Sequence, residues 1–183
     1  MTTGHTWYDT LQIIGQARFT DLLVPTTNER RPGGARAAAL FGRIYLEMAG
    51  GYLRLASVDN DGGLEIRAVE TLGPDGYADA DDEPGTRFPV SLSSTYFGDS
   101  ESVRCATVNY VTNDDSDLSR GVVRCVELTL GGDHRIFFDP IGANGIRIGH
   151  AGAMAAWLRH SANRRSAMQR HTWSPPVQRR PSG

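Results

Sequence analysis

Lysine is absent from this sequence: all 19 basic residues are arginine, set against 21 acidic residues. Arginine presents a planar group that can make bidentate contacts with carboxylates and phosphates, whereas lysine presents a single point charge. The absence is typical of a GC-rich genome, and it also removes the target of lysine-directed modification. The lysine count therefore assigns no function by itself.

Long hydrophobic runs are missing as well. A membrane-spanning helix needs about 20 consecutive, mainly apolar residues, and the apolar runs of this sequence are only a few residues long. The first ten residues, MTTGHTWYDT, lack the basic flank and apolar stretch of a signal peptide. We therefore expect no membrane span and a cytoplasmic protein.

Cysteine is scarce, with one residue in each of two predicted strands, 103–112 and 121–130. A turn centred on Asp115 would place Cys105 opposite Cys125 and allow a disulfide. A slightly later turn places Cys105 opposite Leu128 and gathers an apolar set on one face. Because a one-residue slip would destroy that set, we predict the later turn and two free, buried or half-buried thiols.

Charge is unevenly distributed along the chain. Residues 140–183 contain seven arginines and no acidic residue, which leaves a net charge of −9 on residues 1–139 to give the overall −2. We predict one domain over residues 1–162, followed by a flexible basic tail over 163–183. The tail is a contact surface for an acidic partner or nucleic acid, a segment that docks on the protein's own body, or a solubilising extension. Its candidate contact residues are Arg164, Arg165, Arg170, Arg179 and Arg180.

Alternating or β-branched segments separated by turn residues predict an antiparallel meander. The predicted strands are 42–48, 52–58, 64–72, 103–112, 121–130, 134–139 and 145–149. Residues 35–48 also fit a helical face, but residues 42–48 are assigned to a strand because RIYLEM alternates and lies one tight turn before the next predicted strand. Residues 151–161 have the period of an amphipathic helix, and Thr6 with Asp9 can form a capping box for a short helix over 7–17. We predict an α+β fold with about five to seven strands and one C-terminal helix packed on the sheet.

Residues 73–102 form the longest segment without periodicity, rich in Gly, Pro, Ser and acidic residues. Loops of this length are typically functional or disordered. Several carboxylates in one loop can gather around a hard cation, so the loop contains a candidate metal site. Its acidic residues are Asp79, Asp81, Asp82 and Glu83.

A second candidate site lies where the last predicted strand meets the predicted helix at 151–161. The sequence here combines an arginine, a histidine and glycines at a helix start, where free backbone N–H groups and the helix dipole favour anions. The candidate anion-binding residues are Arg147, Gly149, His150 and Gly152.

The segment HRIFFDP, residues 134–140, places a histidine near an aspartate. On an alternating strand His134 and Asp139 point to opposite faces, so we predict a strand with turn residues at both ends. The sequence carries none of the short catalytic motifs of hydrolases, metalloproteases or phosphate-binding loops. A tertiary arrangement using His134 or His150 stays open as an enzyme hypothesis.

These features favour a non-enzymatic protein-interaction module that needs no cofactor: an accessory, immunity-type or assembly component of a bacterium or phage. The expected partner is another protein, with nucleic acid as the alternative. A second hypothesis is a small-molecule-binding sheet or barrel, with aromatic side chains around a cavity. The candidate aromatic residues are Tyr45, Tyr52, Phe137, Phe138 and Trp157.

Overall fold

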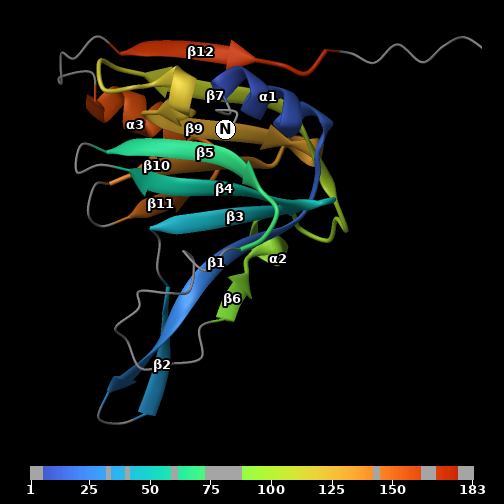
Figure 1. The fold of residues 1–183 in the computed structure, drawn as a ribbon, viewed down its shortest axis with the longest axis vertical. Helices are drawn as coiled ribbons and strands as arrows, with labels where there is room; N and C mark the ends of the chain where they lie inside the picture. The colour runs from blue at the N-terminus through green and yellow to red at the C-terminus, as the bar shows by residue number, and fades with distance from the viewer. Residues whose placement is uncertain are drawn as a thin grey trace, which may run out of the picture.

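The computed structural model describes residues 6–31, 34–39, 42–58, 62–72, 88–141, 145–161 and 168–176. In these ranges twelve strands form one antiparallel sheet with three short α-helices (Figure 1). The strands are β1 (Arg18–Arg31), β2 (Gly34–Ala39), β3 (Arg43–Met48), β4 (Gly51–Val58), β5 (Gly63–Val69), β6 (Phe88–Ser91), β7 (Val103–Thr112), β8 (Val122–Val123), β9 (Cys125–Leu130), β10 (Arg135–Pro140), β11 (Ile146–Gly149) and β12 (Gln169–Trp173). The helices are α1 (Trp7–Gln16), α2 (Ser93–Tyr96) and α3 (Ala153–Ser161), with 3₁₀ turns η2 (Leu118–Arg120) and η3 (Gly131–Asp133).

The predicted class is confirmed, because antiparallel strands dominate and short helices accompany them. The predicted strand number of about five to seven is too low. Sequence patterning found the strands that pair with their neighbours in the chain, such as β3, β4 and β5. It also assigned residues 42–48 to a strand, as observed for β3.

The central strands close into a ring. Strand β1 pairs with β3, β3 with β4, β4 with β5, and β5 with β8. Strand β8 runs through Arg124 into β9, which pairs with β7, and β7 pairs with β1. The β1–β7 and β5–β8 contacts span two residue pairs each. The main apolar core fills this ring with fully buried side chains such as Phe19, Leu46 and Val108.

Helix α1 packs against the ring and is buried on one face. Its N-terminus has the predicted capping box, in which the backbone N–H of Asp9 donates to Thr6 and the N–H of Thr6 donates to Asp9. Trp7 packs edge-on against Tyr110 of β7, with ring centroids 4.9 Å apart. The Thr10 hydroxyl donates to the backbone carbonyl of Ile66 in β5 over 3.3 Å. The helix therefore joins β5 to β7.

Strands β10 and β11 extend the sheet beyond β9, and α3 covers the outer face of this extension. Phe137 packs toward α3 with Val111, Cys125, Met154 and Trp157, whereas Ile136 and Phe138 belong to the main core. Strand β10 is buried on both faces, which explains its uninterrupted apolar run. The prediction of an ordinary strand over residues 134–139 is confirmed.

The prediction of a flexible tail after residue 162 is wrong for residues 169–173. Residues 169–173 form β12, which pairs with β7 from Val108 to Thr112. The predicted C-terminal helix is therefore followed by another strand. The sequence QRHTW has too few apolar residues to signal a strand, and its pairing partner lies about 60 residues earlier in the chain. The remaining tail residues, 163–167 and 177–183, lie outside the described residues.

The loop predicted over residues 73–102 is also too long. Its later part contains β6, which pairs with Leu23–Thr26 of β1, and the one-turn helix α2. Pro89 faces Pro25 in that pairing. Prolines on both strands lower the sequence signal for a sheet, since proline cannot donate a backbone hydrogen bond.

The hairpin over residues 103–130 forms with a different register from the predicted one. Cys105 lies opposite Leu130 rather than Leu128, and the register shifts between Cys105 and Thr107. The turn contains η2, with Gly121 in the left-handed region at φ 72°. Alternation does not signal a bulge or a 3₁₀ turn, so the position predicted for the turn of this hairpin is wrong. The prediction of two free cysteines is confirmed, and both are buried.

In the part of the chain that the structure describes, no helix combines the length and the apolar character needed to cross a membrane.

Gly15 lies in the last turn of α1, where the helix passes close to Trp173 of β12. A Cβ atom on Gly15 would approach the Trp173 ring to 2.6 Å and Pro175 to 3.1 Å. We therefore expect Gly15→Ala to destabilise the protein by about 1–2 kcal/mol despite the higher helix propensity of alanine. In a Trp173→Ala background the cost should fall by at least half, since the closest contact is removed. Chemical denaturation of the four proteins of this double-mutant cycle measures the coupling. An equal cost in both backgrounds would contradict the packing explanation.

Candidate functional site

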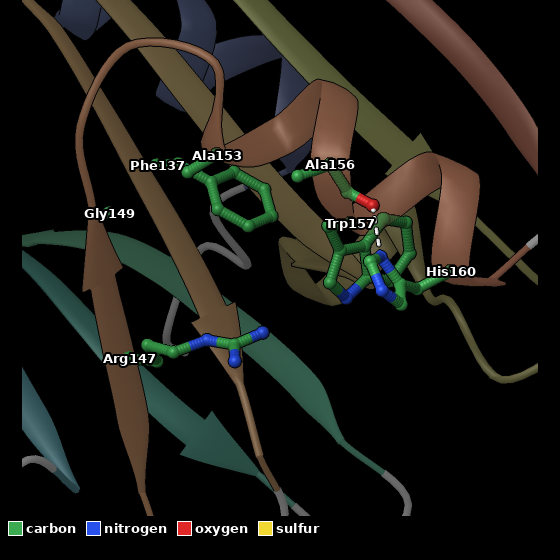
Figure 2. Close-up of a pocket in the computed structure, with 7 residues that line it drawn as sticks. All are labelled: Phe137, Arg147, Gly149, Ala153, Ala156, Trp157 and His160. Atoms are coloured by element: carbon green, nitrogen blue, oxygen red, sulfur yellow. Dashed lines mark hydrogen bonds between the residues drawn. The ribbon is translucent and has the colours of Figure 1, made fainter.

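A pocket of about 510 Å³ lies between α3 and the sheet extension. Strands β10 and β11 supply one side of the pocket, and α3 supplies the other (Figure 2). Its volume is within the range of small-molecule sites in proteins. The residues that line it are Phe137, Arg147, Gly149, Ala153, Ala156, Trp157 and His160.

Two aromatic rings form the apolar part of the pocket. Phe137 from β10 and Trp157 from α3 are both mostly buried and lie with ring centroids 6.2 Å apart, tilted by 55°. The guanidinium carbon of Arg124 lies 5.0 Å from the centroid of the Trp157 ring. A cation over the face of an indole is held by the ring quadrupole, so Arg124 helps to fix the position of Trp157.

A buried carboxylate connects this aromatic wall to the charged part of the pocket. Asp139 is 1% exposed and accepts from Arg124 Nη1 at 3.1 Å and from Arg147 Nη2 at 2.5 Å. Arg124 also donates to the carbonyl of Pro140. Two arginines around one carboxylate leave one excess positive charge. Arg147 is the more exposed of the two, with 59% of its side chain accessible.

The close approach of α3 to β11 depends on Gly149. A Cβ atom at this position would lie 2.5 Å from the Cβ of Ala153 and 3.5 Å from the Phe137 ring. Any larger residue would push the first turn of α3 away from the strand. Gly149 thus sets the distance between the two sides of the pocket.

The structure separates the predicted anion-binding residues. Arg147 and Gly149 line the pocket. The His150 ring instead stacks on Tyr96 of α2, with centroids 4.7 Å apart and planes at 13°. Gly152 lies in the turn before α3 with φ +85°. His160, which the sequence analysis did not select, lines the pocket from one turn after Ala156.

The predicted aromatic residues are likewise divided. Phe137 and Trp157 line the pocket, whereas Phe138 is fully buried in the main core. Tyr45 and Tyr52 pack against each other at 6.2 Å in an edge-to-face pair on β3 and β4. The helical period of residues 151–161 indicated a buried face of α3 that includes Trp157, but pairing with Phe137 across the layers is a tertiary property.

The remaining candidate residues fall mainly outside the described ranges. This applies to the acidic residues Asp79, Asp81, Asp82 and Glu83, and to the arginines Arg164, Arg165, Arg179 and Arg180. Arg170 lies on β12, exposed, opposite Val111. Within the described ranges, no group of three or more His, Cys, Asp or Glu residues is placed to hold a metal ion.

The two cysteines are buried, and His134 and Asp139 have separate neighbours. Burial raises the pKa of Cys105 and of Cys125 to about 12, so both thiols stay protonated at neutral pH. Cys105 also donates to the carbonyl of Thr107. The His134 ring lies beside Gly98 and Gly132. Asp139 is engaged by arginines rather than by His134.

Comparisons of this chain with protein-family models, with curated proteins and with solved structures found no match. A functional proposal therefore rests on the geometry alone.

Both thiols should be inert in the native protein. At pH 8 a pKa of about 12 instead of 9 lowers the thiolate fraction by about 1000-fold. We expect both cysteines to react with Ellman's reagent within minutes in guanidinium chloride and at least 1000-fold more slowly without it. The stability linked to these thiols is complete below pH 9, where unfolded thiols are protonated, and is lost as the pH rises toward 12. Equal native and denatured rates would contradict this assignment, and the single Cys→Ala variants identify which thiol reacts.

The tight contact at Gly149 predicts a large effect from one added methyl group. Gly149→Ala should destabilise the protein by about 1–3 kcal/mol, because α3 must shift to relieve the clash with Ala153. Gly42→Ala is the matched control, since a Cβ there has no atom within 4 Å and the backbone φ is ordinary. Thermal or urea denaturation of both variants measures the difference. A Gly149→Ala variant as stable as the Gly42→Ala variant would show that the helix is not held at this distance.

Proposed function

We propose that this protein is a non-enzymatic protein-interaction module, of the kind that serves in an assembly, and that it binds a protein partner through a projecting hairpin. The hairpin consists of residues 26–31 of β1 and the whole of β2, and we call it the arm. Its backbone pairs from Thr26 opposite Ala39 to Arg31 opposite Gly34. Figure 1 shows the arm extending away from the other strands.

The observation that carries this proposal is the open strand edge of the arm. Among the described strands, β2 pairs with β1 alone, and β6 covers β1 only as far as Thr26. Unpaired N–H and C=O groups along a strand edge are a template for another strand. A two-stranded ribbon is marginally stable in water, so a partner strand that pairs with this edge would also stabilise the arm.

The composition of the arm fits recognition through the backbone. Residues 34–39, GARAAA, are mostly small, and residues 26–31, TTNERR, are polar. Neither segment offers the large apolar side chains of a hydrophobic interface core. Strand addition draws affinity mainly from main-chain hydrogen bonds. The arm carries three arginines and one glutamate, which favours an acidic partner surface.

The observed register allows the arm to be removed cleanly. Because Thr26 faces Ala39, residues 27–38 can be replaced by Asn-Gly, which closes a two-residue hairpin at that pair. We expect this trimmed variant to melt within about 2 °C of the full protein, since the core lies in the ring. It should lose the partner proteins that the full chain retains from its native lysate, together with any self-association seen by light scattering. Nuclease treatment separates partners held through nucleic acid.

Site-specific crosslinking tests the same proposal directly. A photoreactive phenylalanine at position 35, in β2, should crosslink to a partner protein. The same group at Tyr8, which is 69% exposed on α1, is the control for a body surface. Equal crosslinking from both positions, or an unchanged set of partners for the trimmed variant, would overturn the proposal.

A further inference from the structure

We infer that the pocket under α3 binds an aromatic carboxylate, a small molecule with a flat apolar body and one negative charge. This site is separate from the arm, which lies at a different part of the fold (Figure 1). The inference rests on three observations: the volume of the pocket, its aromatic wall, and an arginine whose position is set by a buried carboxylate.

The apolar part of the pocket fits a flat ring system. Phe137 and Trp157 pack against each other at a tilt and form one aromatic wall, and the small side chains of Ala153 and Ala156 leave space beside it. Aromatic ligands gain both from area burial and from edge or offset contacts with such rings. A cavity of about 510 Å³ accepts a bicyclic molecule.

The polar part of the pocket selects a negative charge. Arg147 uses Nη2 to reach Asp139, so the other guanidinium N–H groups remain for a ligand. Figure 2 shows this side chain pointing from β11 into the space between the strand and α3. Asp139 holds the guanidinium in place while Arg124 neutralises the carboxylate, which leaves the charge of Arg147 uncompensated. A ligand carboxylate would receive charge-assisted hydrogen bonds from it.

His160 lines the pocket on the α3 side, away from Arg147 on β11. Its Nδ1 lies 2.9 Å from the carbonyl oxygen of Ala156, and a carbonyl only accepts, so Nδ1 carries a proton. This hydrogen bond fixes the ring of His160 against its own helix. The ligand carboxylate would therefore lie at Arg147, on the β11 side of the pocket.

The neutral and the charged form of one probe separate the two parts of the site. We expect 2-naphthoate to bind the full-length protein with a Kd on the order of 0.1 mM, measured by isothermal titration calorimetry. The uncharged 2-naphthalenemethanol should bind about tenfold more weakly. The Trp157 indole N–H resonance, assigned with Trp157→Phe, should shift on addition of either probe.

Variants of the two sides of the pocket complete the test. Arg147→Gln should weaken naphthoate binding by about tenfold and leave the uncharged probe unaffected. Ala156→Leu should abolish binding of both probes by filling the cavity. The controls lie on the exposed face of the same helix: Arg159→Gln removes an equal charge and Ala155→Leu adds an equal volume, and both should bind like the parent protein.

Binding that is unchanged in Arg147→Gln would overturn the inference, as would unsaturated binding up to about 5 mM. Equal weakening by Arg159→Gln would also overturn it, because general charge and not the pocket would then attract the probe. If Ala156→Leu fails to fold, the comparison of Arg147→Gln with Arg159→Gln still decides.

Discussion

Strand β7 has two hydrogen-bonding edges but three partner strands, β9, β1 and β12. The arrangement of the other elements depends on which partner pairs with each part of these edges. One edge pairs with β9 between Cys105 and Val111. The other edge is divided, with β1 at residues 103–104 and β12 at residues 108–112. Buried backbone N–H and C=O groups require hydrogen-bond partners. Strand β12 supplies these partners along residues 108–112 of β7, where β1 does not reach. Strand β1 leaves β7 after two residue pairs, pairs with β3 and β6, and continues beyond them as the arm.

Both ends of the described chain depend on the same strand. Tyr110 of β7 meets Trp7 of α1 edge-on and stacks on His171 of β12, with ring centroids 4.9 and 4.7 Å apart. Gly15 allows α1 to approach Trp173 of β12. The N-terminal helix and the C-terminal strand are thus packed together around one residue of β7, although they are separated by most of the sequence.

The difference between sequence prediction and structure follows from this long-range pairing. Local signals were sufficient for α1, with its capping box, and for the hairpin of β4 and β5, with its turn residues. Strand β12 has no apolar alternation and becomes a strand because an edge of β7 is open to it. The arm is polar or alanine-rich, so alternation gives no strand signal there. The hairpin of β7 and β9 was recognised, but its bulge shifted the register, since a bulge has no periodic signature.

The same limit applies to the pocket. Arg147 and Gly149 could be selected because a cation and glycines before a helix are a local pattern. His150 belongs to the same pattern, but Tyr96 lies next to it in space and takes its ring as a stacking partner. The helical spacing of apolar residues in α3 predicts that the face with Met154 and Trp157 is buried. The contacts of Trp157 with Phe137 and Arg124 join different elements, so only the tertiary structure shows them.

A comparison within the molecule shows what distinguishes the pocket from an ordinary ion-pair cluster. Glu65 is also held by two arginines, Arg54 at 2.5 Å and Arg67 at 2.6 Å, but these lie on the adjacent strands β4 and β5 and connect them. At Asp139 one arginine packs on the Trp157 ring while the other projects into a cavity. A guanidinium can bind a carboxylate through its edge and an aromatic ring through its face at the same time, which an ammonium group cannot do. In a chain without lysine, this property of arginine joins charge and aromatic surface into one site.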